Sequence, residues 1–320
     1  MSLLIYAESE NGKLKKMAYE VASYASSIAS NMNAEVTAVT INAEDVESLG
    51  QYGVGKVLNV KNESLKAFNE ESYVDVISKA ANEVNAEIIV LSQSANAKYL
   101  APALSVELEA GYASNVVALP ETENGFQVKR NVFTNKAFGM ADITTDKKII
   151  GLSNNAFGLH ENSKTPEVVD FSPEIKGSGI EVKSVDKNTD KVSIADAEVV
   201  VSAGRGLKGP ENWGMIEELA DVLGAATACS KPVSDMGWRP HGEHVGQTGK
   251  PVASNLYIAI GISGAIQHLA GINASKTKVV INTDEEAPFF KAADYGIVGD
   301  AFEVVPQLIE KLKEFKAANA

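Results

Sequence analysis

The residues best suited to chemistry lie in glycine-rich segments of the last 130 residues, which hold 14 of the 25 glycines. Residues 204–209 (Gly-Arg-Gly-Leu-Lys-Gly) have the spacing of a dinucleotide-binding turn between an apolar strand and a helix. A nicotinamide site would also need a carboxylate at the end of the next strand, where the sequence reads Cys229-Ser230-Lys231. A standard NAD site is therefore excluded. The turn either presents Arg205 to a phosphate or cofactor, or is a tight turn that binds no ligand.

Two further segments place polar groups next to flexible backbone. Residues 245–250 (Val-Gly-Gln-Thr-Gly-Lys) are similar to a phosphate loop, but the glycine spacing and Pro251 exclude the Walker pattern. Their Gln and Thr side chains could hydrogen-bond a planar ligand, or the segment could be a surface turn. Residues 256–271 run from a strand through Gly-Ile-Ser-Gly into a short helix, whose N–H groups would suit a pyrophosphate. His268 on that helix is either structural or polarises a cofactor carbonyl.

Two other kinds of chemistry fit these residues poorly. Ser263 would match a hydrolase nucleophile only with glycine at position 265, where the sequence has Ala265, and no Ser–His–Asp order is evident. His241, His244 and Cys229 lack the spacing of a zinc site. We therefore expect no metal site.

Short apolar strands alternate with helix-length segments in the first part of the chain. The predicted strands are 2–7, 35–41, 56–60, 86–91 and 115–119, and the predicted helices are 13–30, 71–84 and 98–110. Continuous apolar strands joined by crossover helices predict a parallel sheet with helices on both faces. Strand-like pieces then occur without convincing helix at 126–133, 148–152, 167–171 and 179–185. We expect these pieces to form an antiparallel extension of the same sheet.

The strand–helix alternation begins again after a polar segment at residues 183–196. The predicted strands are 198–203, 225–229, 256–261, 277–282 and 294–298, with helices at 211–223, 264–270 and 304–315. The expected fold class is α/β, with two doubly wound parallel-sheet domains, 1–188 and 189–320. Because the glycine-rich segments follow strands of the second domain, we expect the chemistry there.

Composition excludes several classes of function. With 29 Lys and Arg against 42 Asp and Glu, the net charge is −13, which argues against binding nucleic acid or an anionic membrane surface. The single cysteine, Cys229, excludes a disulfide framework and an iron–sulfur cluster held by this chain. The sequence has no apolar run long enough for a transmembrane segment, and residues 1–7 read as a first strand rather than a signal peptide. We expect a cytoplasmic protein of a reducing compartment.

Taken in order, the glycine-rich segments resemble the α subunit of electron-transfer flavoproteins. The matching stretches are residues 199–206 (Val-Val-Val-Ser-Ala-Gly-Arg-Gly), 245–250, 256–271, 280–282 (Val-Ile-Asn) and 293–300 (Ala-Asp-Tyr-Gly-Ile-Val-Gly-Asp). The resemblance extends over the whole chain in length and domain order, and it is strongest in the second domain. It implies that this domain binds FAD and that the first domain packs against a β subunit.

The resemblance also implies a function and a set of cofactor-binding residues. The heterodimer would accept electrons from flavin dehydrogenases, such as the acyl-CoA dehydrogenases of fatty acid β-oxidation, and pass them to an acceptor such as a membrane quinone reductase. The protein would be an electron carrier, with no catalytic residue of its own. The implied cofactor-binding residues are Arg205, Ser230, Lys231, Val245, Gly246, Gln247, Thr248, Ser263, Gly264, Ala265, Ile266, Gln267, His268, Asn282, Asp300 and Ala301.

The resemblance divides these residues among the parts of FAD. Residues 205, 230 and 246–248 would surround the isoalloxazine ring, with Thr248 bonded near its redox-active nitrogen. Residues 263–268 would line the ribityl–pyrophosphate side and the carbonyl edge of the ring, where His268 would help to stabilise charge on the reduced flavin. Asn282 and Asp300 would contact the adenosine part.

Lys231 departs from the family pattern, which usually has an arginine stacked over the flavin at this position. Lysine keeps the positive charge but loses the planar fork of donors, so we expect a raised flavin potential with a less rigidly held ring. Two alternatives stay open: the α subunit of an electron-bifurcating, NADH-dependent flavoprotein, and a module that binds AMP or ATP without a redox role. The second would need the glycine loops but not Gln247, Thr248 and His268.

Overall fold

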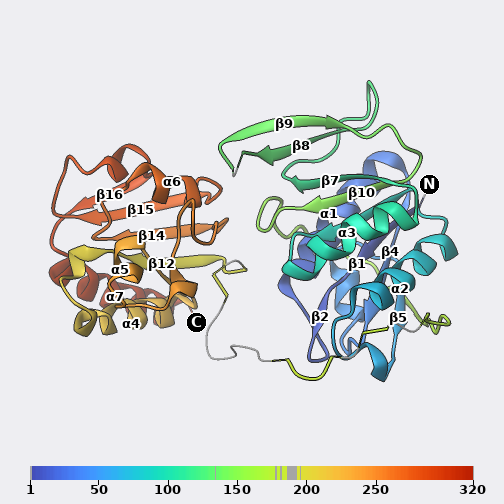
Figure 1. Ribbon diagram of the computed structural model, residues 1–320, viewed down its shortest axis with the longest axis horizontal. Coiled ribbons are helices and arrows are strands. Elements are labelled where there is room, and N and C mark those ends of the chain that lie inside the picture. The colour runs from blue at the N-terminus through green and yellow to red at the C-terminus, as the bar shows by residue number, and fades with distance from the viewer. Residues whose placement is uncertain are drawn as a thin grey trace. The chain divides into compact units, whose positions relative to one another are not determined.

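The computed structural model describes residues 2–133, 135–176, 179–180, 182–185, 193–194 and 196–319. The chain divides into two compact units (Figure 1). The first comprises Met1–Val132 and Phe138–Lys187, and the second Phe133–Ala137 and Asn188–Ala320. The predicted boundary between residues 188 and 189 lies outside the described residues.

The described residues of the first unit form one large sheet, a short hairpin and three α-helices. Its strands are β1 (Ser2–Tyr6), β2 (Ser9–Glu10), β3 (Lys13–Leu14), β4 (Glu35–Ile41), β5 (Lys56–Val60), β6 (Ile88–Ser92), β7 (Gly111–Val116), β8 (Gln127–Val132), β9 (Ala137–Asp142), β10 (Lys148–Leu152) and β11 (Glu167–Asp170). The sheet has nine strands in the order β11-β5-β4-β1-β6-β10-β7-β8-β9. Strands from β11 to β7 pair in parallel, and β8 pairs antiparallel with β7. This confirms a parallel sheet with an antiparallel extension.

Two strands that were expected in the antiparallel extension belong to the parallel part instead. β10 lies between β6 and β7, and β11 pairs with β5 at the opposite edge. The side chains explain the position of β10, because Ile149 packs into the core on one face of the sheet and Ile150 into the core on the other. A strand buried on both faces belongs in the middle of a sheet. The described residues of the segment 179–185 form no strand.

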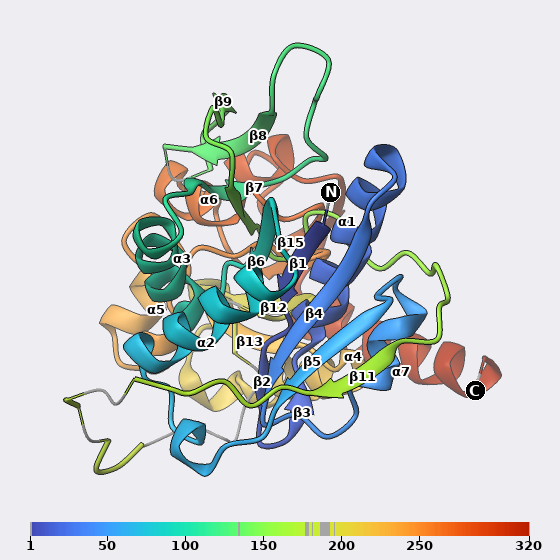
Figure 2. The same cartoon turned by 90° about the vertical axis from the view of Figure 1, so that its right-hand side faces the viewer.

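Helices cover both faces of this sheet (Figure 2). They are α1 (Lys16–Met32), α2 (Glu70–Glu83) and α3 (Ala95–Glu107), with short 3₁₀ turns η1 (Glu47–Gln51) and η2 (Glu63–Leu65). Leu3 and Ile5 of β1 pack with the apolar face of α1, whereas Leu4 and Tyr6 pack with α2 and α3. Alternate residues of a strand point to opposite faces, so one apolar run serves both cores.

The second unit contains a five-stranded, wholly parallel sheet. Its strands are β12 (Val199–Ala203), β13 (Ala226–Cys229), β14 (Leu256–Ile260), β15 (Thr277–Asn282) and β16 (Tyr295–Val298). Its helices are α4 (Gly214–Leu223), α5 (Lys231–Asp235), α6 (Ile266–Ile272) and α7 (Ala301–Ala318), with 3₁₀ turns η3 (Arg205–Leu207), η4 (Pro210–Asn212), η5 (His241–Glu243) and η6 (Pro288–Lys291). The strand order is β13-β12-β14-β15-β16.

The strand order creates a point where the direction of winding reverses. From β12 the chain goes first to β13 on one side and then to β14 on the other. α4 and α7 pack on one face of the sheet, while Ile272 of α6 and Phe289 pack on the other. In such doubly wound sheets ligands bind outside the carboxyl ends of the strands at this reversal point.

No helix in the described part of the chain is long and apolar enough to cross a membrane.

Candidate functional site

The carboxyl edge of the second sheet collects polar residues from every part of the second unit. Arg205 follows β12, Ser230 follows β13, Ser263 follows β14, Asn282 ends β15, and Asp300 comes just after β16. All five strands are parallel, so their carboxyl ends share one edge. The predicted cofactor-binding residues are far apart along the chain, and the fold places these five on one edge of the sheet.

The loops after β12 and β14 touch through their backbones. The N–H of Gly206 donates to the carbonyl oxygen of Gly261 at 3.1 Å. Gly261 has φ +60°, and a Cβ on it would lie 2.8 Å from the Cα of Gly206. Such an approach is open only to glycine. Two of the three glycine-rich segments therefore form one bare backbone surface at the reversal point of the sheet.

The third glycine-rich segment is held between β13 and α6. The N–H of Val245 donates to the Cys229 carbonyl at 3.0 Å, and the N–H of Gln247 donates to the Gln267 carbonyl at 2.7 Å. The side chains of Gln247, Thr248 and Gln267 are exposed. Within the described residues these three side chains have no hydrogen-bond partner. Their amide and hydroxyl groups are thus available to a ligand.

His268 lies buried behind this surface, next to a tyrosine that the sequence analysis did not include in the site. Its Nε2 is 2.9 Å from the hydroxyl oxygen of Tyr257, and the Tyr257 ring stacks on Phe289. Burial, together with the nearby His244, lowers the pKa of His268 to about 4. His268 is therefore neutral at pH 7. Burial also raises the pKa of Tyr257, so the phenol keeps its proton.

Two predicted residues at the edge already have structural partners. The Asp300 carboxylate accepts a hydrogen bond from the N–H of Phe302 at 2.9 Å and caps α7. Its other oxygen lies 3.6 Å from Nζ of Lys208, whose ammonium also sits over the Phe302 ring. The Asn282 amide donates to the Ile262 carbonyl at 3.1 Å. Sequence reasoning missed Lys208, although its positive charge between two glycines, close to Arg205, was visible.

The other predicted residues differ in exposure. Ser230, Val245, Gly246, Gly264 and Ala301 are buried, whereas Arg205, Lys231, Ser263, Ala265 and Ile266 are exposed. Ile266 has 79% of its surface exposed, which is unusual for a large apolar side chain. It begins α6 beside the Gly-Ile-Ser-Gly segment, where it can cover part of a bound ligand.

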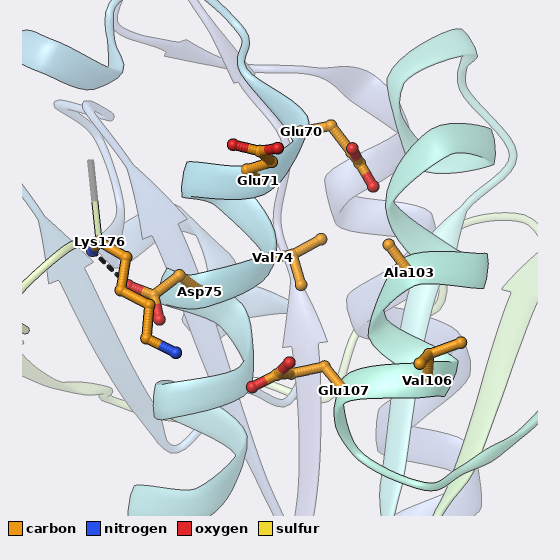
Figure 3. A pocket seen from close by; sticks show the side chains of 8 residues that line it. All are labelled: Glu70, Glu71, Val74, Asp75, Ala103, Val106, Glu107 and Lys176. Carbon is orange, nitrogen blue, oxygen red and sulfur yellow. Dashed lines mark hydrogen bonds between the residues drawn. The ribbon is translucent and has the colours of Figure 1, made fainter. Parts of the chain in front are cut away.

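The described residues contain a groove elsewhere, and it includes none of the predicted site residues. It has a volume of about 570 Å³, lies in the first unit between α2 and α3, and is lined by Glu70, Glu71, Val74, Asp75, Ala103, Val106, Glu107 and Lys176 (Figure 3). Burial acts to raise the pKa of Asp75, but hydrogen bonds from the N–H of Lys176 and from Nζ of Lys79, together with the charges of both lysines, lower it overall. The groove is lined by four carboxylates, which would repel the phosphates of a cofactor.

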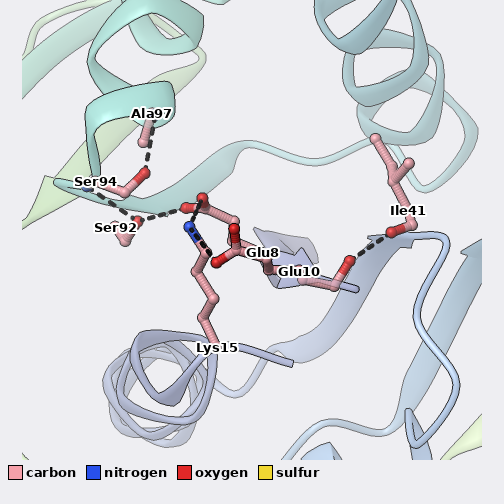
Figure 4. A network of polar contacts seen from close by, with 8 residues as sticks. Glu8, Glu10, Lys15, Ile41, Ser92, Ser94 and Ala97 are labelled. Atoms are coloured by element: carbon pink, nitrogen blue, oxygen red, sulfur yellow. Dashed lines mark hydrogen bonds and ion pairs between the residues drawn. The ribbon is translucent and has the colours of Figure 1, made fainter. Parts of the chain in front are cut away.

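The first sheet also has a reversal point, between β1 and β6. Side chains of the chain itself form a polar network next to it. Glu8 is 3% exposed, and its carboxylate accepts from Nζ of Lys15 at 2.6 Å and from Ser92 Oγ at 3.4 Å (Figure 4). Ser94 caps α3 by accepting from the N–H of Ala97. A buried carboxylate at this position disfavours a bound anion.

The residues considered for zinc have other environments. His241 Nδ1 lies 3.1 Å from Ser234 Oγ, and burial raises the pKa of the Cys229 thiol to about 12. Over the part of the chain that the structure describes, no three His, Cys, Asp or Glu side chains are grouped to hold a metal ion.

Comparison with known proteins matches both units of the chain. Residues 3–176 match the family model described as "Electron transfer flavoprotein domain". Residues 193–273 match the one described as "Electron transfer flavoprotein FAD-binding domain". The second match includes the loops after β12 and β14 and the segment 245–250. Asn282, Asp300 and Ala301 lie beyond it.

Curated relatives align over almost the whole chain. The electron transfer flavoprotein subunit alpha of Thermoanaerobacterium thermosaccharolyticum is 38% identical, with 98% of each chain covered. The protein of the same name from Bacillus subtilis is 35% identical, covering 98% of this chain and 97% of the relative. Protein FixB of Clostridium saccharobutylicum is 33% identical, with the same shares covered. The chain therefore belongs to the family of electron transfer flavoprotein alpha subunits, and its second unit carries the FAD-binding domain of that family.

Proposed function

We propose that this chain holds FAD at the carboxyl edge of β12–β16 and carries electrons as the α subunit of a heterodimer with a β subunit. The observation that carries the proposal is the contact between the loops at Gly206 and Gly261, at the reversal point of the sheet. When bound, FAD supplies the redox chemistry, so the chain has to supply binding, orientation and electrostatics.

The donors at the edge suit such a cofactor. Gln247 and Thr248 present uncommitted neutral hydrogen-bonding groups, and the first N–H groups of α6 have no carbonyl within the helix to bond. Arg205 and Lys231 are exposed and bring positive charge, whereas His268 is neutral at pH 7. This set of residues can orient a polar ring and balance phosphate charge, and it requires no acid–base pair.

The direct test is the visible absorption spectrum of the purified chain, alone and in complex with its β subunit. Each sample is incubated with FAD, desalted and measured again. Retained flavin bands support the proposal. A complex that stays colourless after incubation with FAD contradicts it, and retention of AMP or ATP would then favour the nucleotide-binding module. Flavin bands in the complex alone would indicate that the β subunit supplies essential FAD contacts.

The electron donor and acceptor form the finer part of the proposal. We propose that flavin dehydrogenases, such as acyl-CoA dehydrogenases of fatty acid β-oxidation, reduce the complex and that a quinone reductase reoxidises it. Bleaching of the flavin by an acyl-CoA dehydrogenase with its substrate supports this. Bleaching by NADH instead would favour the electron-bifurcating alternative. The cytoplasmic location also stays a prediction, which cell fractionation tests.

Lys231 provides a quantitative prediction for this site. Removing its charge in Lys231→Ala should lower the two-electron flavin potential by roughly 20 mV, equivalent to about 1 kcal/mol, because the cation favours the more negative reduced form. Lys231→Arg should keep the potential close to that of the wild type. Spectroelectrochemical titration of the loaded complex measures both. An unchanged potential in Lys231→Ala would show that this charge does not act on the flavin.

A further inference from the structure

Arg239 lies at the centre of a cluster of charged and aromatic side chains in the second unit. Its Nε and Nη2 donate to the two carboxylate oxygens of Glu243, each at 2.7 Å, and its Nη1 donates to Glu217 at 2.9 Å. The guanidinium also lies over the Trp213 ring, 5.3 Å from the ring centroid. The Arg239 side chain is 14% exposed and that of Glu243 is 10% exposed. A bidentate pair of this kind fixes the direction of both groups, and partial burial strengthens it.

The cluster joins two elements that are separate along the chain. Trp213 and Glu217 lie at the beginning of α4, whereas Glu243 ends the turn η5. The residues that follow Glu243 are His244 and then the segment 245–248, which carries Gln247 and Thr248. Arg239 therefore links the start of this segment to α4, which packs on the sheet.

The glycine content of this segment would leave its backbone flexible without contacts to the scaffold. Gly242, Gly246 and Gly249 occur within eight residues, so the unbound backbone has many accessible conformations. Hydrogen bonds from Val245 and Gln247 hold it on the sheet and α6 sides. Ordering a flexible segment on binding costs conformational entropy and weakens the affinity. A segment that is ordered before the ligand binds avoids this cost.

We propose that Arg239 is a positioning residue that orders the segment 245–248 for FAD, acting through Glu243 and without touching the cofactor. The proposal rests on the proposed function, because it assumes that this segment contacts FAD. Lysine could keep the charge of Arg239 but not its fork of donors, so it could not hold Glu243 and Glu217 together. The hydrogen bonds with Glu243 raise the pKa of Arg239, so the guanidinium of Arg239 stays charged.

The test compares Arg239→Lys with the wild type in the full chain complexed with its β subunit. We expect the dissociation constant for FAD to rise roughly tenfold and the visible circular dichroism of the bound flavin to change. Lys313→Gln is the matched control, because it removes an exposed ion pair between α7 and Glu218 of α4 that does not involve the segment. It should leave both readouts as in the wild type.

A second variant separates positioning from folding. Arg239→Met with Glu243→Leu replaces the pair by apolar side chains of similar volume, so no buried charge is left unpaired. We expect its unfolding midpoint without FAD to stay near that of the wild type while its dissociation constant for FAD still rises roughly tenfold.

The outcomes distinguish the two proposals. An FAD affinity and dichroism spectrum in either folded variant equal to those of the wild type would overturn the positioning role. An unfolding midpoint that falls while the affinity stays unchanged would show that Arg239 serves stability alone. A wild-type complex that binds no FAD would overturn the proposed function itself.

Discussion

Replacing Gly204 with alanine is expected to destabilise the second unit by about 3 kcal/mol and to abolish retention of FAD. The added Cβ would lie 2.3 Å from the carbonyl oxygen of Gly261 and 2.9 Å from a side-chain carbon of Ile262. Gly204 is buried, and its N–H donates to the Ile260 carbonyl, so the loop cannot move away without breaking backbone hydrogen bonds. Urea unfolding followed by tryptophan fluorescence measures the effect, because both tryptophans belong to the second unit.

Gly214→Ala is the matched control for this substitution. A Cβ at Gly214 meets no atom within 4 Å, and the residue begins α4. Alanine should therefore leave the stability unchanged or raise it by up to about 1 kcal/mol, and FAD retention should be that of the wild type. If Gly204→Ala unfolded at the same urea concentration as this control, the result would contradict the close approach of Gly204 to Gly261.

The second large effect is a loss of stability in mild acid that originates in His268. Its pKa in the folded protein is about 4, whereas an unperturbed histidine has a pKa near 6.5. The unfolded chain therefore binds the proton more readily between these values. The stabilisation is fully present above pH 6.5 and is lost as the pH falls towards 4, by about 3 kcal/mol in total. The wild type should lose this amount relative to His268→Gln, whose side chain does not titrate.

The measurement is the free energy of unfolding from pH 7.5 to 4, followed by tryptophan fluorescence for both proteins. Glutamine can still accept a hydrogen bond from Tyr257, so the difference between the curves isolates the titration of position 268. His160→Gln serves as a control, because His160 is exposed in the first unit and its loss should leave the curve of the wild type unchanged. Parallel curves for wild type and His268→Gln would mean that the buried imidazole does not resist protonation.

The sequence by itself determined the fold class and the family. Continuous apolar strands such as Leu3–Tyr6 and 199–203 predict parallel sheets because each strand must supply two cores, and the structure has them. The order of the three glycine-rich segments indicated the family to which the chain belongs. Both signals are local, since each depends on a few neighbouring residues and on what the backbone permits there.

The tertiary structure alone decided which distant residues meet. β10 entered the middle of the first sheet, although consecutive strand-like pieces had suggested an antiparallel edge. The sequence contains Tyr257 and His268, but only the packing of α6 against β14 brings them to 2.9 Å and lowers the pKa of the histidine. The hydrogen bond from Arg239 to Glu217 likewise forms only because the fold brings these two residues together. Strand order, burial and long-range pairs depend on contacts between elements, and no local pattern specifies them.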